Sequence, residues 1–275
     1  MHTISVVIPT FNRKKFLARA INSIITQSKS PDEIIVVDDG SSDGTETLVK
    51  NNYPRISYYR QSNKGVSAAR NLGIRKSSGQ IIAFLDSDDE WVAEKLEKQI
   101  EFIIENPTFR FVHCDETWFK NGKIFNQKKY HKKRGGFLFF DSLKRCSMSP
   151  SAVIVCRTIF NDYGLFDESL PACEDYDLWL RISRKEKIGF IDEALVKKHG
   201  GHDGQLSKTT KILDYFRVQS IYKLIQDKQL NDTQEDAAYA VLTKKIEIVK
   251  QGAIKHNNLE QLKKIEQLEC QINQI

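Results

Sequence analysis

The chain has 275 residues, 40% of them hydrophobic, which is enough to bury the core of one large α/β domain or of one domain with a small helical appendage. Its net charge is +6, but the lysines are scattered and aromatic residues do not interleave with them, so no nucleic-acid partner is expected. Because the chain has neither a membrane-span pattern nor a signal-peptide pattern, we expect a cytoplasmic protein. The five cysteines contain no Cys-x-x-Cys pair, which favours reduced thiols.

Up to about residue 115, apolar runs alternate with helical patterns, which predicts a mostly parallel sheet covered by helices. The predicted strands are residues 4–8, 34–37, 56–59, 81–85 and 109–114. The predicted helices are residues 14–27, 45–51, 66–77 and 91–106. Ligands of such sheets bind beyond the carboxyl ends of the strands, so a site is expected at residues 9–12, 38–40 and 86–89.

The next part of the chain is less regular. Residues 117–149 lose the alternation and contain the basic run 128–134, which predicts a mobile insertion. A buried strand is predicted at residues 151–156 and a helix at residues 174–185.

After Lys208 the pattern is helical to the end of the chain, so we place a domain boundary at residue 207. The predicted units are a catalytic domain at 1–207, divided into halves at 1–115 and 116–207, and a helical extension at 208–275. One face of the extension is apolar and predicts packing, either on the catalytic domain or on a second subunit in a homodimer. The alternative is peripheral attachment to an anionic membrane.

The apolar run at residues 81–85 ends directly in Asp86-Ser87-Asp88-Asp89. Carboxylates this close repel one another, so a cation is expected with them, and hard oxygen ligands suit Mg²⁺ or Mn²⁺. This predicts a metal-dependent site for a phosphate-bearing substrate. An acidic turn that caps the following helix is the alternative, and it is compatible with a metal site.

A second acidic turn, which begins at Asp38-Asp39-Gly40, follows the second predicted strand. A carboxylate held there can accept hydrogen bonds from a base or from ribose hydroxyls. The turn also resembles the start of a calcium loop, but Lys50 stands where the twelfth position needs a bidentate glutamate. Calcium is therefore disfavoured.

Charged residues also lie at the predicted starts of two helices. Lys64 and Arg70 flank the start of the helix at 66–77, where they can neutralise a diphosphate. Glu174 and Asp175 begin a later helix, either as acids stabilised by the helix dipole or as a general base.

A glycine-rich loop at residues 199–207 carries His199 and His202. Glycines give such a loop freedom to close over a ligand, and imidazoles can contact a phosphate or a metal. The sequence therefore predicts a lid here, without deciding which histidine faces the site.

Taken together, these segments resemble the family-2 glycosyltransferases of the GT-A fold, an inverting class that uses nucleotide sugars. The resemblance covers residues 3–207 and rests on the order and spacing of short motifs. These motifs are Val7-Ile8-Pro9-Thr10-Phe11-Asn12, residues 37–45, residues 65–71, Phe84-Leu85-Asp86-Ser87-Asp88-Asp89, and Glu174-Asp175 with Leu178, Trp179 and Arg181.

The resemblance implies a role for each matching residue. Those assigned to the nucleotide sugar, expected to be a UDP-sugar, are Pro9, Thr10, Phe11, Asn12, Asp39, Arg70, Asp86 and Ser87. The residues assigned to the metal, Mn²⁺ or Mg²⁺, are Asp88 with Asp86, and His202 or His199. Because Asp89 follows, an alignment shifted by one residue is the alternative. Asp175 matches the catalytic base, with Glu174 beside it. The implied acceptor is a hydroxyl-bearing glycan or a lipid-linked sugar of bacterial surface-polysaccharide or lipopolysaccharide synthesis.

Three other classes remain as rivals. A haloacid-dehalogenase-like phosphatase also ends a strand in Asp-x-Asp, but its nucleophile lies near the start of the domain, whereas earlier predicted strands precede the one that ends at Asp86. A nucleotidyltransferase needs a glycine-rich, arginine-bearing first loop, which is missing from residues 9–15. A non-catalytic nucleotide-sugar-binding protein is disfavoured because both Asp88 and Asp175 are present.

Overall fold

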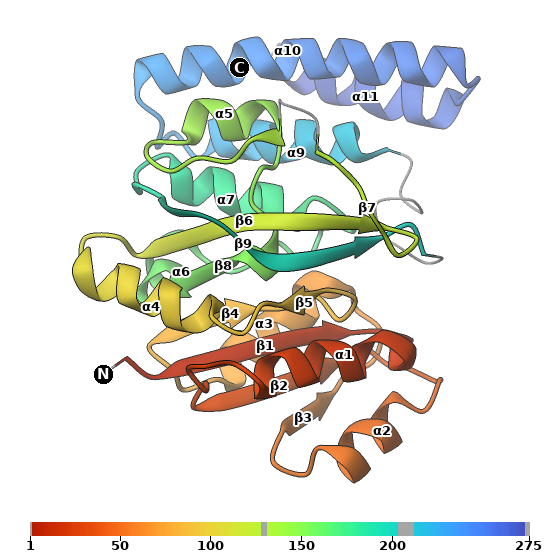
Figure 1. Ribbon diagram of the computed structural model, residues 1–275. Coiled ribbons are helices and arrows are strands. Elements are labelled where there is room, and N and C mark those ends of the chain that lie inside the picture. Colours follow the sequence, from red (N-terminus) through yellow and green to blue (C-terminus); the bar gives the residue numbers. More distant parts are fainter. Residues whose placement is uncertain (1, 128–130, 203–211, 273–275) are drawn as a thin grey trace.

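One mixed sheet of nine strands runs through the molecule (Figure 1). The computed structural model describes residues 2–127, 131–202 and 212–272. The strand order is β3-β2-β1-β4-β8-β6-β9-β5, with β7 paired to β6. Strands β3, β2, β1 and β4 are mutually parallel, whereas β8 is antiparallel to both β4 and β6. The α/β fold with a Rossmann-like parallel half, flanking helices and a helical C-terminal region is thus confirmed.

The first half of the chain follows the predicted alternation closely. Its elements are β1 Ile4–Thr10, α1 Lys14–Ile25, β2 Glu33–Asp38, α2 Thr45–Asn52, β3 Ser57–Arg60, α3 Val66–Lys76, β4 Ile81–Phe84, β5 Glu90–Trp91 and α4 Lys95–Glu105. One boundary is wrong, because Trp91 lies in a short strand and the helix begins only at Lys95. The Trp91 indole donates a hydrogen bond to the Ser151 carbonyl oxygen (2.8 Å), which holds this segment against the sheet.

The second half contains more regular structure than its sequence pattern predicts. Its elements are β6 Phe111–Lys120, β7 Lys123–Ile124, α5 Phe139–Lys144, η2 Pro150–Ala152, β8 Val153–Cys156, α6 Thr158–Tyr163, α7 Glu174–Ser183 and β9 Gly189–Gly200. Strand β6 runs on into the segment interpreted as an insertion, and β9 was not predicted. The two strands pair in parallel with register shifts around Asp115, which break the alternation expected of a regular strand.

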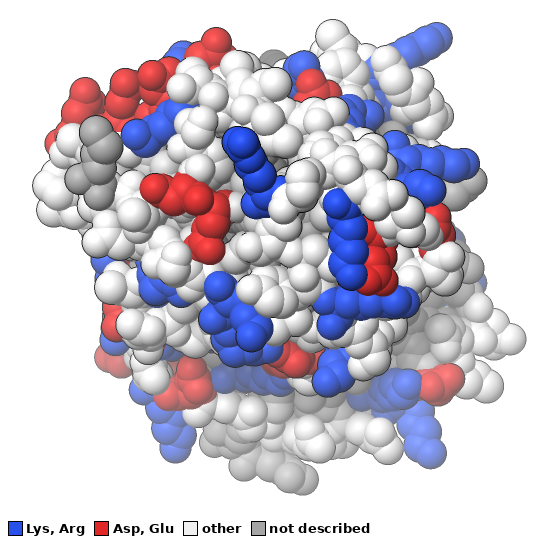
Figure 2. Space-filling view, turned by 90° about the horizontal axis from the view of Figure 1, so that it is seen from below, with Lys and Arg blue, Asp and Glu red and all other residues white. Residues whose placement is uncertain are grey.

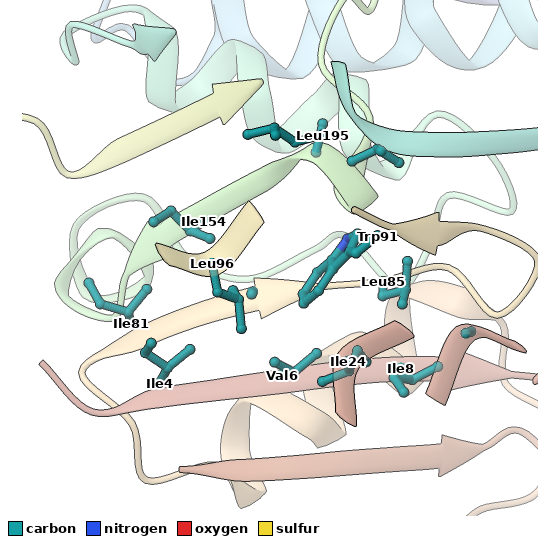
Figure 3. Packing of buried hydrophobic residues seen from close by; sticks show 14 of the residues in the cluster. Ile4, Val6, Ile8, Ile24, Ile81, Leu85, Trp91, Leu96, Ile154 and Leu195 are labelled. Atoms are coloured by element: carbon teal, nitrogen blue, oxygen red, sulfur yellow. The ribbon is translucent and has the colours of Figure 1, made fainter. Parts of the chain in front are cut away.

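The hydrophobic core lies on both faces of the sheet. On one face, residues of β1 and β4 such as Ile4, Val6 and Ile81 pack against α1 and α4 (Figure 3). On the other face, Val7 and Phe84 belong to a cluster that includes residues of α3, α6 and α7. Burial on both faces explains why these strands are apolar without interruption.

Helix α3 lies unusually close to the sheet at Gly73. A Cβ atom added there would come within 2.2 Å of Cγ1 of Val7, a distance that real contacts do not reach. Glycine at this position lets the helix pack directly on β1, and the same helix carries Arg70 one turn earlier.

The helical C-terminal region consists of α9 Leu213–Gln226, α10 Asp232–Lys255 and α11 Leu259–Ile272. Its apolar residues, among them Ile221 and Leu242, form one cluster with Leu143 of α5 and with Tyr176 and Leu180 of α7. The apolar face of α9 therefore packs on α5 and α7, in agreement with the packing hypothesis from the sequence. The boundary predicted at residue 207 lies outside the described residues.

Charges of both signs are interspersed on the face in Figure 2, which views the molecule from the α2 side of Figure 1. The net charge of +6 is therefore not gathered into one patch on this face. Among the described residues, no helix is both long and apolar enough to cross a bilayer. All five cysteines are free thiols.

Candidate active site

A cavity of about 570 Å³ opens at the carboxyl ends of β1, β2 and β4. Loop residues after these strands line one side, and α7, β9 and α9 line the other. Most residues predicted for the site line this cavity: Pro9, Thr10, Phe11, Asp39, Arg70, Asp86, Ser87, Asp88, Glu174, Asp175 and His199. Asn12 and His202 are not among the lining residues and contact the loops beside it.

The loop after β1 is joined to the loop after β2 through Asn12. This residue has a positive φ of 50°, its N–H donates to Ser41 Oγ (2.8 Å), and its Oδ1 accepts from the Ser42 N–H (2.8 Å). Asparagine tolerates such a backbone and can make both bonds. Asn12 thereby supports the wall of the cavity, in which Phe11 is half exposed.

Asp39 is almost fully buried, and both of its carboxylate oxygens are used. They accept hydrogen bonds from Gln61 Nε2 (2.7 Å), the Lys64 N–H (2.8 Å) and the Gly65 N–H (2.8 Å). The carboxylate thus holds the turn that leads into α3, while the Lys64 side chain is exposed. In this arrangement Asp39 shapes the loop at the cavity in addition to lining it.

Arg70 of α3 links the two sides of the cavity. Its guanidinium donates to Asp86 Oδ1 and to Glu174 Oε1, both at 2.6 Å, and is itself buried. Burial favours the neutral form, but the two carboxylates outweigh it and raise the pKa of Arg70, which stays charged. Burial also raises the pKa of Glu174 against the effect of Arg70. Two residues predicted from separate motifs are therefore joined by one cation.

The last two acids of the turn after β4 have different surroundings. Asp89 is buried; its carboxylate accepts from Ser151 Oγ (2.7 Å) and the His199 N–H (3.1 Å), and burial together with Asp88 and Asp86 raises its pKa. Asp88 is more accessible, with 20% of its side chain exposed. Oδ2 of Asp88 contacts His202 (2.8 Å) and Arg13 (3.5 Å).

The two histidines of the predicted lid point to different neighbours. Nε2 of His202 lies 2.8 Å from Oδ2 of Asp88, and the guanidinium of Arg13 contacts both residues. The His199 ring stacks on Phe119 at 5.1 Å between centroids and approaches Glu90. The ring of His202 is thus the one beside Asp88, whereas His199 lines the cavity and contacts Asp89 through its backbone N–H. Residues 203–207 of the predicted lid lie outside the described residues.

Asp175 stands in the first turn of α7 and faces the cavity. Its Oδ1 accepts from the Tyr176 N–H (2.7 Å), and its Oδ2 lies 3.5 Å from the thiol of Cys146. Burial raises the pKa of Cys146, and Asp175 raises it further, so the thiol keeps its proton and can donate it. A thiol is a weak donor, so this carboxylate retains capacity to accept a further hydrogen bond.

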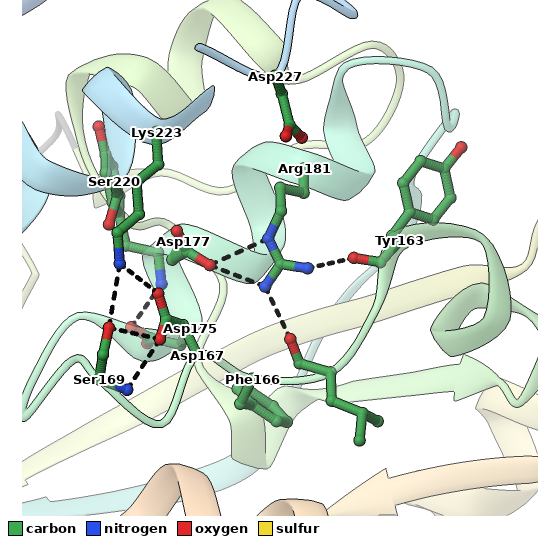
Figure 4. A network of polar contacts seen from close by, with 12 residues as sticks. Tyr163, Phe166, Asp167, Ser169, Asp175, Asp177, Arg181, Ser220, Lys223 and Asp227 are labelled. Atoms are coloured by element: carbon green, nitrogen blue, oxygen red, sulfur yellow. Dashed lines mark hydrogen bonds and ion pairs between the residues drawn. The ribbon is translucent and has the colours of Figure 1, made fainter. Parts of the chain in front are cut away.

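Helix α7 is fixed by a polar network around its outer side (Figure 4). Arg181 pairs with Asp177 (2.7 Å) and donates to the carbonyl oxygens of Leu165 (2.8 Å) and Tyr163. Lys223 of α9 binds Asp167 (2.6 Å) in the loop before α7. The Arg181 bonds tie α7 to the segment after α6, and the Lys223–Asp167 pair ties the loop before α7 to α9.

Lys198 of β9 lines the cavity and was missed by sequence reasoning. Burial would lower its pKa, but the carboxylates of Glu116, Asp89 and Asp86 raise it above the usual range. Glu116 itself is buried beside Lys133 (2.8 Å), which lowers its pKa to about 2 despite burial. Lys198 lies two residues after the apolar residue Val196. The sequence would have predicted its place at the site only if strand β9 had been predicted.

Leu213 and Arg217 also line the cavity and come from α9. Sequence reasoning assigned this region no part in the site. Only the packing of α9 on α7 brings it there, and no local motif indicates that contact.

Comparison with known proteins agrees with the fold and with the motifs. The family model "Glycosyl transferase family 2" matches residues 5–164. The crystal structure of S. aureus TarS 1–349 in complex with UDP-GlcNAc superimposes with a TM-score of 0.74 at 19% identity, covering 96% of this chain and 79% of that one. The fold is therefore that of a GT-A glycosyltransferase.

Two curated relatives support the same assignment. A glycosyltransferase of Rickettsia conorii is 36% identical over 196 residues, which are 70% of this chain and 32% of the relative. The Escherichia coli UDP-Glc:alpha-D-GlcNAc-diphosphoundecaprenol beta-1,3-glucosyltransferase WfgD is 31% identical over 195 residues, 70% of this chain and 74% of WfgD. The chain belongs to glycosyl transferase family 2. It spans about a third of the length of the Rickettsia conorii relative.

Proposed function

We propose that this chain transfers a sugar from a nucleoside-diphosphate sugar, a UDP-sugar, to an acceptor hydroxyl with inversion at the anomeric carbon. The observation that carries the proposal is the single cavity at the strand ends, which gathers the acidic turn after β4, Arg70 and Asp175. Family membership supports the reaction class. The UDP-GlcNAc complex of TarS, which shares the fold, supports the donor class.

The donor is assigned to the side formed by β1, β2 and β4. Pro9, Thr10, Phe11 and Asp39 form the nucleobase end, and Arg70 with Asp86 and Ser87 lies toward the diphosphate. Parallel strands present their carboxyl ends and the following helix starts to ligands at this edge, and helix starts favour anions.

A divalent cation, Mn²⁺ or Mg²⁺, is assigned to Asp88 with Asp86 and His202. Among the described residues no group of three metal-binding side chains gathers. Mg²⁺ is commonly held by one or two carboxylates together with substrate phosphates, so the Asp88–His202 pair fits a site that the donor completes. Such a cation, when bound, offsets the negative charge on the departing diphosphate.

Asp175 is assigned as the general base that removes the proton of the acceptor hydroxyl. Its carboxylate lines the cavity, and of the two described hydrogen bonds to it one comes from a weak thiol donor. Glu174 next to it is occupied by Arg70 and joins the acceptor side to the donor side. One displacement from the face opposite the leaving group inverts the anomeric centre.

The acceptor is proposed to be a lipid-linked or otherwise surface-destined bacterial glycan, and the site of action the cytoplasmic side of the membrane. The name of WfgD specifies a diphosphoundecaprenol-linked acceptor, and this supports the assignment. Peripheral contact with the membrane and pairing of two chains through α10 and α11 are further proposals. Neither is required by the chemistry of the cavity.

The proposal is tested by thermal unfolding with UDP. UDP with Mn²⁺ is expected to raise the melting temperature, whereas UDP with a chelator is expected to do so much less, because a ligand stabilises only the state it binds. Asp88→Asn should remove most of this difference. Asp192→Asn, an exposed acid near the other end of β9, is the matched control. Equal stabilisation in chelator and in Mn²⁺ would exclude the metal assignment.

Turnover separates an enzyme from a non-catalytic binding protein. A panel of UDP-sugars is incubated with the full chain and Mn²⁺, and UDP release is measured with and without candidate acceptors. Release from at least one donor is expected. A protein that binds UDP and releases none from any UDP-sugar, with lipid-linked acceptors included, would support the binding-protein alternative.

A further inference from the structure

Part of the cavity lining has no role assigned toward the donor, and we call it the acceptor end. The acceptor end is lined by Pro171, Ala172 and Cys173 before α7 and by Leu213 and Arg217 of α9. Like Asp175, these residues lie outside the segment 5–164 that matches the family model. The family match therefore assigns no role to them.

The charge of the acceptor end differs from that of the donor end. Asp214 Oδ1 accepts from Nη1 of Arg217 (3.0 Å) and from Nζ of Lys245 (3.0 Å). Two cations share one carboxylate, so the three groups carry a net charge of +1. Arg217 is the member of this group that lines the cavity.

The guanidinium of Arg217 has donors to spare. Among the described residues only its Nη1 makes a hydrogen bond, and its carbon lies 5.9 Å from the centre of the Tyr176 ring. Tyr176 follows Asp175 directly, so the cation lies on the same side of the cavity as the proposed base. A planar guanidinium held on an aromatic ring suits bidentate recognition of phosphate or carboxylate.

We propose that Arg217 binds an anionic group of the acceptor, a phosphate ester or a uronate carboxylate, and so places the acceptor hydroxyl near Asp175. This assignment rests on the proposed transferase function. It gives α9 a part in acceptor selection and names the acceptor class as a negatively charged glycoside or glycosyl phosphate. The aliphatic wall at Leu213 accommodates the apolar part of such a molecule.

The test uses three probes of equal chain length: octyl phosphate, octyl glucuronide and octyl glucoside. Calorimetric titrations are made into the full chain saturated with UDP and Mn²⁺, so that the donor diphosphate site is already filled. Wild type is expected to bind one or both charged probes about 10- to 100-fold more tightly than octyl glucoside, the range for a hydrogen bond to a charged group. Phosphate and glucuronide arms distinguish the two acceptor classes.

Variants locate the preference. Arg217→Met is expected to bind all three probes equally, and Arg217→Lys to keep part of the preference. Lys245→Met removes the other cation from Asp214 without touching the cavity, so it should keep the full preference. If Lys245→Met lost the preference as Arg217→Met does, the effect would come from loosening of α9, and the inference would be wrong.

The wild-type comparison decides the matter even if a variant fails to fold. If UDP-saturated wild type binds octyl glucoside as tightly as it binds both charged probes, the role of Arg217 is overturned and the transferase proposal stays intact. Failure to bind UDP at all would overturn the transferase proposal first.

Discussion

The donor side and the acceptor side of the cavity are built in different ways. On the donor side, two buried carboxylates accept hydrogen bonds from nearby backbone and hydroxyl groups: Asp39 from the turn before α3, and Asp89 from Ser151 and the His199 N–H. On the acceptor side, Asp175 has one backbone donor and a thiol, and Arg217 has a single carboxylate. The donor side is therefore already organised, while the acceptor side keeps hydrogen-bonding capacity for a ligand.

This difference indicates a division of labour. A donor shared by many enzymes can be held by a rigid sheet edge whose loops are tied to each other, whereas acceptors vary and are met by helices that only tertiary packing brings together. The acceptor side should thus depend on distant parts of the chain. The donor side should depend on local hydrogen bonds.

Removal of residues 208–275 is the strongest test of the first dependence. Of the residues lost, the buried apolar residues of α9 are Phe216, Val218, Ile221, Leu224 and Ile225. At about 1.5–3 kcal/mol each, their contacts together match the whole stability of an ordinary domain. We expect insoluble protein or loss of cooperative unfolding, measured by circular dichroism. Removal of residues 259–275, which contain the buried residue Ile265, should cost far less. A soluble, cooperatively folded 1–207 fragment would contradict the dependence of the acceptor side on distant parts of the chain.

Asp175→Asn is expected to lower transfer by about 10²- to 10⁴-fold, the usual scale of general-base catalysis, and to leave UDP binding unchanged. UDP release in the presence of acceptor gives the rate, and the UDP-dependent melting temperature gives the binding. Asp177→Asn is the control, because Asp177 pairs with Arg181 and should affect stability rather than rate. Near-normal transfer by the Asp175 variant would assign the base to another group.

The buried strand β6 should make stability sensitive to pH through His113. Burial lowers the pKa of this histidine to about 3, so between pH 6.5 and 4.5 the unfolded chain takes up a proton that the folded chain does not. Stability is expected to fall by about 2–3 kcal/mol over that window, and His113→Gln should lack this loss. Burial raises the pKa of Asp89 and Glu174, which acts in the opposite direction, so the measured quantity is the difference between wild type and variant in urea unfolding. If the unfolding free energies of wild type and His113→Gln fell in parallel with pH, the role of His113 would be contradicted.

Asp39→Asn tests the local bonds of the donor side and has the smallest expected effect. An amide oxygen can still accept from one backbone N–H, but the charge is lost, so about 1 kcal/mol of unfolding free energy should go with it. UDP affinity should fall about tenfold because the turn before α3 is less well held. Asp43→Asn, which alters a neighbouring loop outside the cavity lining, is the control. Unchanged UDP affinity would show that the loop does not need Asp39.

Sequence alone predicted which residues line the cavity at the ends of β1, β2 and β4, because the signals there are local. Each strand there ends directly in the residues that line the cavity, as at Asp86, so a strand prediction is also a site prediction. The alternation of strands and helices has short periods that one segment can show by itself.

The rest of the cavity lining was predicted only in part. A motif placed Asp175 there, whereas Lys198 and Arg217 were not predicted, because their positions depend on which segments pack together. Strand β9 was hidden by exposed residues 192–194 and by the register shifts opposite β6. Nothing in the sequence of α9 distinguishes Arg217 from Lys223, the other basic residue of that helix.

Gly73 lies on the helix that packs on β1 in the core and that also carries Arg70 to the cavity. Because a single methyl group there would collide with Val7, the spacing between α3 and the sheet admits almost no variation. Arg70 lies on the same helix and joins Asp86 to Glu174. The spacing between α3 and the sheet therefore also sets the position of the residue that joins the two sides of the cavity. A side chain larger than glycine at position 73 would therefore change both the packing of α3 on β1 and the position of Arg70 between Asp86 and Glu174.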